Sequence, residues 1–292
     1  MIGPGAPLVV TGAAGFLGRR VMEALGGRAI GVSRRPQPGT LNFPLEDAAA
    51  FQNLLASRRP EAVLHLAGQV HGSEDELQHA NVGLVEAVLA TAVPAGVRVV
   101  TVGSAAEYGD PGTSAPVPED GPERPSSAYG RTKLAATRLC EAARASGGDV
   151  TVGRLFNLVG PGMGTEHPFA DFAAQVQRLP RSRGVVHVGN ADVVRDFVTV
   201  DFAVAALVQM ATRGGPHGVV NVCSGRGVRF GDAVQAMLDV RGITADVVSA
   251  DRPAIPAVVG DPRRLQATHG LVATADVVDL ARLALDGSSQ IA

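Results

Sequence analysis

Lysine is almost missing from this chain of 292 residues, which contains 25 arginines but a single lysine, Lys133. Tryptophan is absent, and tyrosine and cysteine occur twice each. Cys140 and Cys223 are too few for a disulfide framework and lack the spacing of metal ligands, so we expect buried, reduced thiols. The seven histidines form no ligand pair on a predicted helix. No metal site is therefore predicted.

A strong charge of one sign and a long apolar run are also missing. The formal net charge of −2 gives no electrostatic reason to expect nucleic acid or an anionic membrane as a partner. Residues 1–7 have no signal-peptide pattern, and Glu86, Pro94 and Arg98 interrupt the most apolar stretch, residues 84–106. We therefore expect a cytoplasmic protein with the composition of an ordinary globular fold, 46% hydrophobic and 18% charged.

The chain alternates between short runs rich in β-branched residues and longer amphipathic stretches. The runs predict buried parallel strands over residues 8–11, 29–33, 62–66, 97–102 and 150–155. The stretches between them predict helices over residues 15–25, 45–57, 74–92 and 127–145. This succession predicts an α/β fold with a doubly wound parallel sheet of Rossmann type and right-handed crossovers.

The alternation breaks after Asn157, where a loop rich in glycine and proline begins. We expect residues 1–156 to form a first domain of Rossmann type. Residues 157–194 and 224–292 are expected to form a smaller C-terminal part that binds the substrate. Segments near residues 195–223 again resemble sheet elements, so the chain is expected to return there to the first domain.

A glycine-rich turn follows the first predicted strand and opens the first predicted helix. Gly12 permits a tight turn, Gly15 lets the backbone approach a pyrophosphate, and Gly18 lets helix and strand pack closely. The helix N-terminus adds unpaired N–H groups and positive potential. The predicted cofactor contacts in this turn are Gly12, Gly15, Phe16, Leu17 and Gly18. A glycine-rich turn without a ligand is the alternative.

The second predicted strand ends in Ser33, Arg34 and Arg35 rather than in an acid. In NAD-binding sites a carboxylate at this place accepts hydrogen bonds from the adenosine ribose. A carboxylate would repel a 2′-phosphate, whereas a hydroxyl and two guanidinium groups would bind it. We therefore expect NADP(H) to be preferred over NAD(H). Two solvated surface arginines would give the same pattern.

The single lysine lies four residues after Tyr129, one of the two tyrosines. A randomly placed lysine would fall at that spacing about one time in 150. On the helix predicted over residues 127–145, the side chains of Tyr129 and Lys133 share one face. An ammonium beside a phenol favours the phenolate and lowers the phenol pKa, which is near 10 when unperturbed. Lysine suits this place better than arginine, because it is a compact point charge that can also donate to a ribose hydroxyl.

The fourth predicted strand leads into Ser104, which places this hydroxyl at the carboxyl edge of the sheet. There it can bind a carbonyl or carbinol oxygen while Tyr129 transfers the proton. A serine by itself at such a place is more often a turn residue. Beside Tyr129 and Lys133, we interpret it as a candidate catalytic residue.

Together these motifs resemble the extended short-chain dehydrogenase/reductases of the NAD(P)-dependent nucleotide-sugar epimerase/dehydratase superfamily. They run in the family's order over most of the chain: TGAAGFLG at 11–18, HLAG at 65–68, NVGLVEAVLATA at 81–92, VGSAAEYG at 102–109, YGRTK at 129–133, RLFNLVGPG at 154–162 and RDFVTVDFAVAAL at 195–207. Several stretches are most similar to the GDP-4-keto-6-deoxymannose reductases and related 4-ketoreductases, among them GSAAEYG, VGNADVVRDFVTV and VVGDPRRL.

The resemblance implies roles for particular residues. It makes Ser104, Tyr129 and Lys133 the catalytic triad. It places around the cofactor the backbone of Leu66, Ala67 and Gly68 and the side chains of Asn81, Tyr129 and Lys133. It places Ser104, Asn157 and Arg195 against the substrate, and we expect Arg264 to help Arg195 clamp the diphosphate. The helical stretches 74–92 and 127–145 resemble the pair through which this family forms homodimers.

Two alanines, Ala105 and Ala106, follow Ser104. The family's sugar dehydratases carry acid there because water elimination needs an additional acid and base, so dehydration is not expected. Glu107 is expected to be structural. We expect NADPH-dependent reduction of the C4 ketone of an NDP-4-keto-6-deoxyhexose, with Tyr129 as proton donor. The alternatives are an NAD(P)-dependent NDP-sugar 4-epimerase, which usually retains NAD, and a non-catalytic NAD(P)-sensing protein on the same fold.

Overall fold

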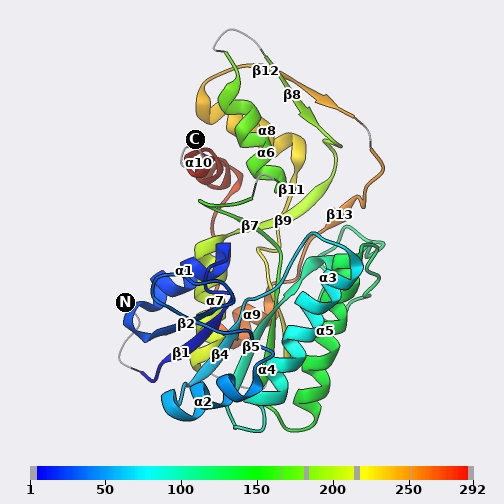
Figure 1. Cartoon of the computed structure of the whole chain (residues 1–292). Helices are drawn as coiled ribbons and strands as arrows, with labels where there is room; N and C mark the ends of the chain where they lie inside the picture. Colours follow the sequence, from blue (N-terminus) through cyan, green and yellow to red (C-terminus); the bar gives the residue numbers. More distant parts are fainter. Residues whose placement is uncertain (1–4, 165, 181–183, 214–217, 251, 289–292) are drawn as a thin grey trace.

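A seven-stranded parallel sheet forms the centre of the larger, lower part of the molecule (Figure 1). The computed structural model describes residues 5–164, 166–180, 184–213, 218–250 and 252–288. The sheet has the strand order β10-β6-β5-β4-β1-β2-β3. Its strands are β1 (Leu8–Thr11), β2 (Ala29–Ser33), β3 (Thr40–Asn42), β4 (Ala62–His65), β5 (Arg98–Ser104), β6 (Val150–Leu155) and β10 (Gly218–Val222). The predicted doubly wound parallel sheet is confirmed.

Helices cover both faces of this sheet, because successive strand residues bury apolar side chains on opposite sides. Val9 and Val63 face one layer, and Val10 and Leu64 face the other. The first layer contains α2 (Ala48–Arg58), α4 (Leu84–Ala92) and α5 (Ala128–Ala145). The second contains α1 (Phe16–Leu25), α7 (Val200–Arg213) and α9 (Arg263–His269). Burial on both faces explains why the strands appear in the sequence as short apolar runs.

The stretch predicted as one helix over residues 74–92 is helical throughout but changes its pitch. It consists of α3 (Glu74–Gln78), a π-helical turn at His79–Gly83, and α4. Ser73 begins it with a capping box, in which its hydroxyl accepts from the backbone N–H of Glu76. The π turn brings Asn81 into the interior, where the side chain is 1% exposed. π turns of this kind occur frequently at functional sites.

The strand order reverses direction between β1 and β4. From β1 the chain adds β2 and β3 on one side, whereas β4, β5 and β6 lie on the other. In such sheets a crevice opens beyond the carboxyl ends of the strands at the point of reversal. The glycine-rich turn after β1, the segment after β4 and Ser104 at the end of β5 all lie at this edge.

A smaller, upper part is built around a second apolar core (Figure 1). Phe169, Phe172, Phe197 and Phe230 contact one another there through their rings. In this part β9 pairs with β7, β11 and β13, and β8 pairs with β12. Its elements are β7 (Asn157–Val159), α6 (Pro168–Arg178), β8 (Gly184–Val188), β9 (Val194–Thr199), β11 (Gly227–Arg229), α8 (Phe230–Arg241), β12 (Ala245–Ser249), β13 (Ala257–Val258) and α10 (Val277–Ser288).

The chain passes between the two parts more than once. After β9 it returns to the large sheet as α7 and β10, within the range 195–223 expected for the return. β9 itself pairs with the strands of the upper part, and α9, from the segment 224–292, packs against α7 beside the large sheet. The division into a cofactor-binding and a substrate-binding part stays a prediction.

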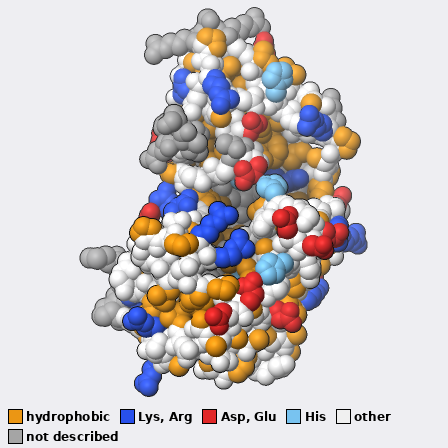
Figure 2. All heavy atoms as spheres, viewed as in Figure 1, with side chains coloured by type: hydrophobic (Ala, Val, Ile, Leu, Met, Phe, Trp, Pro, Cys, Tyr) orange, Lys and Arg blue, Asp and Glu red, His pale blue; other side chains and the backbone are white. Residues whose placement is uncertain are grey.

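The surface between the two parts is hollowed on the face shown in Figure 2, and basic, acidic and histidine side chains gather around the hollow. Over the described residues, the helices are too short or too polar for any of them to span a bilayer. The carboxyl edge of the large sheet faces the upper part, so the crevice predicted by the strand order lies between the two parts (Figure 1).

Candidate active site

The glycine-rich turn after β1 brings backbone very close to backbone. Gly12 has φ +68°, and a Cβ on it would lie 2.6 Å from the backbone nitrogen of Ala67. A Cβ on Gly18 would lie 2.1 Å from the carbonyl oxygen of Gly12. Gly15 precedes α1 and has no side chain to cap it, so the first N–H groups of α1 suit an anionic ligand. Phe16 and Leu17 open α1 at this turn and remain predicted contacts.

A pocket of about 250 Å³ adjoins the turn, between the end of β2 and the segment that follows β4. Ser33 and Arg34 line it. Ser33 is buried, and its Oγ accepts a hydrogen bond from the backbone N–H of Arg35 at 3.3 Å. A carboxylate, that of Glu46, also lines the pocket, and His79 lies 3.0 Å from it. The end of β2 therefore brings a hydroxyl and a guanidinium to this pocket.

Hydrogen bonds of Asn81 link the segment after β4 to α5, the helix that carries Tyr129 and Lys133. Its Nδ2 donates to the carbonyl oxygen of Gln69 at 2.9 Å and to Oγ1 of Thr132 at 3.1 Å. Its Oδ1 accepts from the backbone N–H of Gln69 at 2.9 Å. Residues 66–68, predicted to face the cofactor with their backbone, thereby line the pocket in a fixed position. The sequence did not show this link, because Thr132 lies far along the chain and the π turn has no clear sequence signal.

The three predicted catalytic residues lie at one junction of the fold. Ser104 is the last residue of β5, and Tyr129 and Lys133 lie in the first turns of α5. The side chain of Ser104 lies near enough to the Tyr129 phenol to lower the pKa of that phenol. Lys133 is 5% exposed. The structure thus brings together the residues that the spacing and the resemblance selected.

The start of α5 packs closely against the turn that follows β5. Ser127 caps the helix by accepting a hydrogen bond from the backbone N–H of Gly130 at 3.0 Å. A Cβ on Gly130 would lie 2.5 Å from the carbonyl oxygen of Ala106. Glycine at position 130 therefore allows the close approach that sets Tyr129 beside Ser104.

Burial has the largest effect on the acidity of Tyr129. It raises the pKa of the phenol, the Ser104 side chain acts in the opposite direction, and the negative charge of Glu107 raises the pKa further. The pKa of Tyr129 is thus raised rather than lowered as expected, because burial has the largest effect on it, and the Nζ of Lys133 donates to the carbonyl oxygen of Val102 at 2.5 Å. A phenol with a raised pKa is protonated at neutral pH, as a proton donor must be.

The two candidate substrate residues from the upper part are held by backbone carbonyls. Asn157 donates through Nδ2 to the carbonyl oxygen of Asp196 at 2.7 Å. Arg195 donates to the carbonyl oxygens of Val194 at 2.8 Å and Ile255 at 2.9 Å, and burial lowers the pKa of its guanidinium. These bonds fix both residues near the junction of β7 and β9, so a role against substrate remains a prediction.

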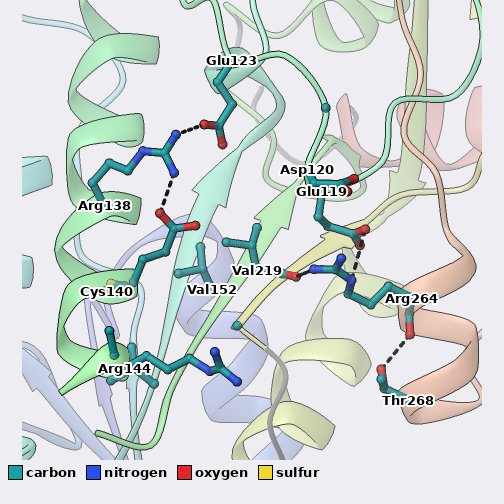
Figure 3. Close-up of a pocket in the computed structure, with 15 residues that line it drawn as sticks. Glu119, Asp120, Glu123, Arg138, Cys140, Arg144, Val152, Val219, Arg264 and Thr268 are labelled. Carbon is teal, nitrogen blue, oxygen red and sulfur yellow. Dashed lines mark hydrogen bonds and ion pairs between the residues drawn. The ribbon is translucent and has the colours of Figure 1, made fainter. Parts of the chain in front are cut away.

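Arg264 does not lie with the other candidates, which corrects its expected role at the substrate diphosphate. Its guanidinium donates to the carbonyl oxygen of Val219 at 2.8 Å and pairs with Glu119 at 3.3 Å. It lines a pocket of about 860 Å³ between the second half of α5, the starts of β6 and β10, and α9 (Figure 3). The catalytic residues line the opposite, carboxyl edge of the sheet. A sequence motif gives the position of an arginine in the chain but not the direction in which its side chain points.

Glu107 points away from the crevice into the protein. It is fully buried and accepts hydrogen bonds from the backbone N–H of Ser104, from Thr137 and from Arg154. Residues 105–106, which follow Ser104 directly, are alanines and carry no carboxylate. Sequence reasoning did not identify Arg154, although a charged residue inside an apolar strand was a usable signal.

Comparisons with known proteins identify the family. The pattern of the NAD dependent epimerase/dehydratase family matches residues 8–223, which include the glycine-rich turn, Ser104, Tyr129 and Lys133. The chain therefore belongs to this family and is an NAD(P)-dependent enzyme of the extended short-chain dehydrogenase type.

Its relatives include enzymes named for both reduction and oxidation at nucleotide sugars. The chain is 28% identical over 254 residues to GDP-6-deoxy-D-mannose reductase of Pseudomonas aeruginosa, covering 82% of each chain. It is 32% identical over 270 residues to dTDP-6-deoxy-L-talose 4-dehydrogenase (NAD(P)(+)) of Kitasatospora kifunensis, covering 85% of this chain and 83% of that one. Among solved structures it resembles RMD from Pseudomonas aeruginosa complexed with NADPH, with 26% identity, a TM-score of 0.82, and coverage of 98% and 100%.

Proposed function

We propose that this protein reduces the C4 ketone of an NDP-4-keto-6-deoxyhexose with NADPH. The two relatives described above are named for redox chemistry on 6-deoxyhexose nucleotides. The site agrees with such a reaction, because Ser104, Tyr129 and Lys133 supply proton transfer and binding. With alanine at residues 105–106, the site lacks the additional acid and base that water elimination requires.

In this reaction NADPH supplies the hydride, and the protein supplies the proton and the geometry. Tyr129 donates its phenol proton to the alkoxide that develops at C4, and its raised pKa keeps it protonated until then. Ser104 holds the same oxygen through its hydroxyl. Lys133 would hold the cofactor by donating to its ribose. Asn157 and Arg195 bind the substrate's diphosphate end in this proposal.

The choice of reductase over epimerase rests on the end of β2. A net reductase draws on a pool of NADPH, whereas a 4-epimerase retains its cofactor through a cycle that uses no net reductant. Ser33 and Arg34 line the pocket beside the glycine-rich turn, and Arg35 follows them. These groups suit a 2′-phosphate better than a free ribose hydroxyl pair. We therefore propose that NADP(H) is preferred.

Replacing Arg34 and Arg35 together with alanine should weaken NADPH binding by about 100-fold or more, since each charge-assisted hydrogen bond contributes roughly 1.5–3 kcal/mol. The dissociation constant of NADH should stay within about twofold. Calorimetric titration of both cofactors measures this. Arg58→Ala, which removes an exposed arginine at the end of α2, is the matched control. Equal weakening of NADPH and NADH, or tighter NADH binding by the unaltered protein, would contradict the assignment.

The activity itself is tested by incubating the protein with an NDP-4-keto-6-deoxyhexose and NADPH. A fall of absorbance at the reduced-nicotinamide band supports the reductase. The second candidate is a nucleotide-sugar 4-epimerase, which the family's name includes. It would interconvert NDP-hexoses without net use of cofactor. A third, an NAD(P)-sensing protein without turnover, would bind cofactor and change neither substrate nor cofactor.

We also propose a homodimer formed through α4 and α5, and a cytoplasmic location. Both helices expose side chains on the outside of the large sheet, among them Glu86 and Ala90 on α4 and Arg138 and Ala142 on α5. Light scattering on the purified protein should give about twice the chain mass of 29.9 kDa. A mass equal to one chain would exclude the dimer.

A further inference from the structure

Glu107 is a carboxylate without exposed surface, three residues after Ser104. Its two oxygens have different partners. Oε1 accepts from the backbone N–H of Ser104 at 2.6 Å. Oε2 accepts from Oγ1 of Thr137 at 3.0 Å and from Nε of Arg154 at 2.9 Å. A single side chain therefore joins the end of β5 to α5 and β6.

The partner on α5 belongs to the same row as the catalytic candidates. Tyr129, Lys133 and Thr137 follow one another at intervals of four residues, so they share one face of the helix. The bonds from Glu107 to Ser104 and to Thr137 thus hold the serine against this row. The Ser104 hydroxyl and the Tyr129 phenol must lie at a fixed distance from each other if both are to act on the same substrate oxygen.

The basic side chains of Arg154 and Lys133 are both buried near the carboxylate of Glu107. Arg154 has no exposed side-chain surface and pairs with Glu107 at 2.8 Å and with Glu123 at 2.6 Å. The ammonium of Lys133 is also buried, and its described hydrogen bond goes to a carbonyl, not to a carboxylate. Glu107 is thus a carboxylate that acts on both of these side chains. At the surface the network ends at Arg138, which binds Glu123 (Figure 3).

We propose that Glu107 is a positioning residue of the active site: it holds Ser104 against the row of Tyr129 and Lys133, and it places a negative charge beside the buried basic side chains there. It does not reach the crevice and acts only through these neighbours. The inference rests on the proposed function for the roles of Ser104 and Tyr129. A buried ion pair by itself stabilises a fold little, so the role of Glu107 follows from the groups that it holds in place.

Titratable groups face this network from every element packed against it. They are His65 on β4, Tyr108, Glu119 and Glu123 in the segment after β5, Tyr129, Lys133, Arg138 and Cys140 on α5, and Arg154 on β6. Burial lowers the pKa of Lys133 and the charge of Glu107 raises it, while the same charge raises the pKa of Tyr129. The charge of Glu107 therefore acts in favour of the protonated form of both groups, although burial keeps the pKa of Lys133 below its usual value.

The pKa of Tyr129, measured by its phenolate absorbance, tests the effect of the Glu107 charge directly. This measurement needs no substrate. The chain has no tryptophan and two tyrosines, and Tyr108→Phe leaves Tyr129 as the only phenol. In that background Glu107→Gln keeps the length of the side chain and an oxygen for Ser104 but removes the charge. The pKa of Tyr129 should then fall by about half a unit or more. An unchanged or raised value would overturn the proposal.

A second variant carries the test if Glu107→Gln does not fold. Thr137→Val keeps the shape of the side chain and removes the donor that neutralises part of the Glu107 charge. The pKa of Tyr129 should then rise, opposite in sign to the effect of Glu107→Gln. No change in this variant would equally overturn the proposal.

Measurements of turnover distinguish a positioning role of Glu107 from a merely structural one. In Glu107→Gln the folded enzyme should lose about 10-fold or more in kcat with little change in the Kd for NADPH. The alkaline limb of its pH profile should move to lower pH, because both Tyr129 and Lys133 lose their protons earlier. A merely structural role would lower only the folded fraction and leave kcat per folded molecule and the limb unchanged. If the unaltered protein reduces no sugar, the proposed function fails, whereas the tyrosine titration still decides the role of Glu107.

Discussion

Tyr129→Phe should lower kcat by about 10²- to 10⁴-fold, the range contributed by a positioned acid or base. The phenol is the group that the structure places beside Ser104 with its proton retained by burial. The substitution removes one oxygen and keeps the ring, so NADPH should bind with a Kd within about threefold of the original. Stopped-flow or steady-state turnover, together with cofactor titration, measures both quantities.

The matched control is Tyr108→Phe, which removes the only other phenol. Tyr108 has no exposed surface, its hydroxyl donates to Oδ1 of Asn221 at 2.7 Å, and burial raises its pKa to about 12. Loss of that bond should lower the free energy of unfolding by about 1 kcal/mol. Its kcat should stay close to that of the original protein. If Tyr129→Phe turned over as fast as Tyr108→Phe, Tyr129 would have no part in the mechanism.

Lys133→Arg should impair both turnover and NADPH binding, lowering kcat/KM by about 100-fold or more. The lysine is 5% exposed and its Nζ lies 2.5 Å from the carbonyl oxygen of Val102, so a planar guanidinium with five donors does not fit the same space. The charge is conserved in this variant. The loss therefore reports shape and hydrogen bonding rather than charge.

The reciprocal exchange on the same helix is the control for Lys133→Arg. Arg131 is exposed and pairs with Glu74 at 3.1 Å on the surface. Arg131→Lys should leave kcat/KM within about twofold, because exposed ion pairs contribute little. Full activity of Lys133→Arg would remove the explanation of why a chain with 25 arginines retains one lysine.

The large sheet could be predicted because its strands are buried on both faces. β1 (Leu8–Thr11) and β6 (Val150–Leu155) begin and end where the apolar runs do. β3 (Thr40–Asn42) was not predicted, since it has three residues, two of them exposed, and pairs only along the edge of the sheet. The strand pairings of the upper part join distant short segments, and no local pattern specifies them.

The catalytic candidates could be predicted because their chemistry depends on local spacing. Tyr129 and Lys133 lie one helical turn apart, and Ser104 ends a recognisable strand. The side chains that hold them could not be predicted in the same way. Glu107 and Arg154 lie 47 positions apart and are joined only by the pairing of β5 with β6. The acidity of Tyr129 also required the structure, because burial, which the sequence does not give, has the largest effect on it.

Transfer of deuterium from the cofactor to the sugar distinguishes the proposed reductase from the other candidate functions. NADPH carrying deuterium at the reactive position of the nicotinamide is incubated with the protein and an NDP-4-keto-6-deoxyhexose, and the sugar product is examined by mass spectrometry and NMR. The account predicts one deuterium at C4 for each NADPH oxidised, and none with Tyr129→Phe over the same time. Interconversion of NDP-hexoses with no NADPH oxidised and no deuterium at C4 would contradict it.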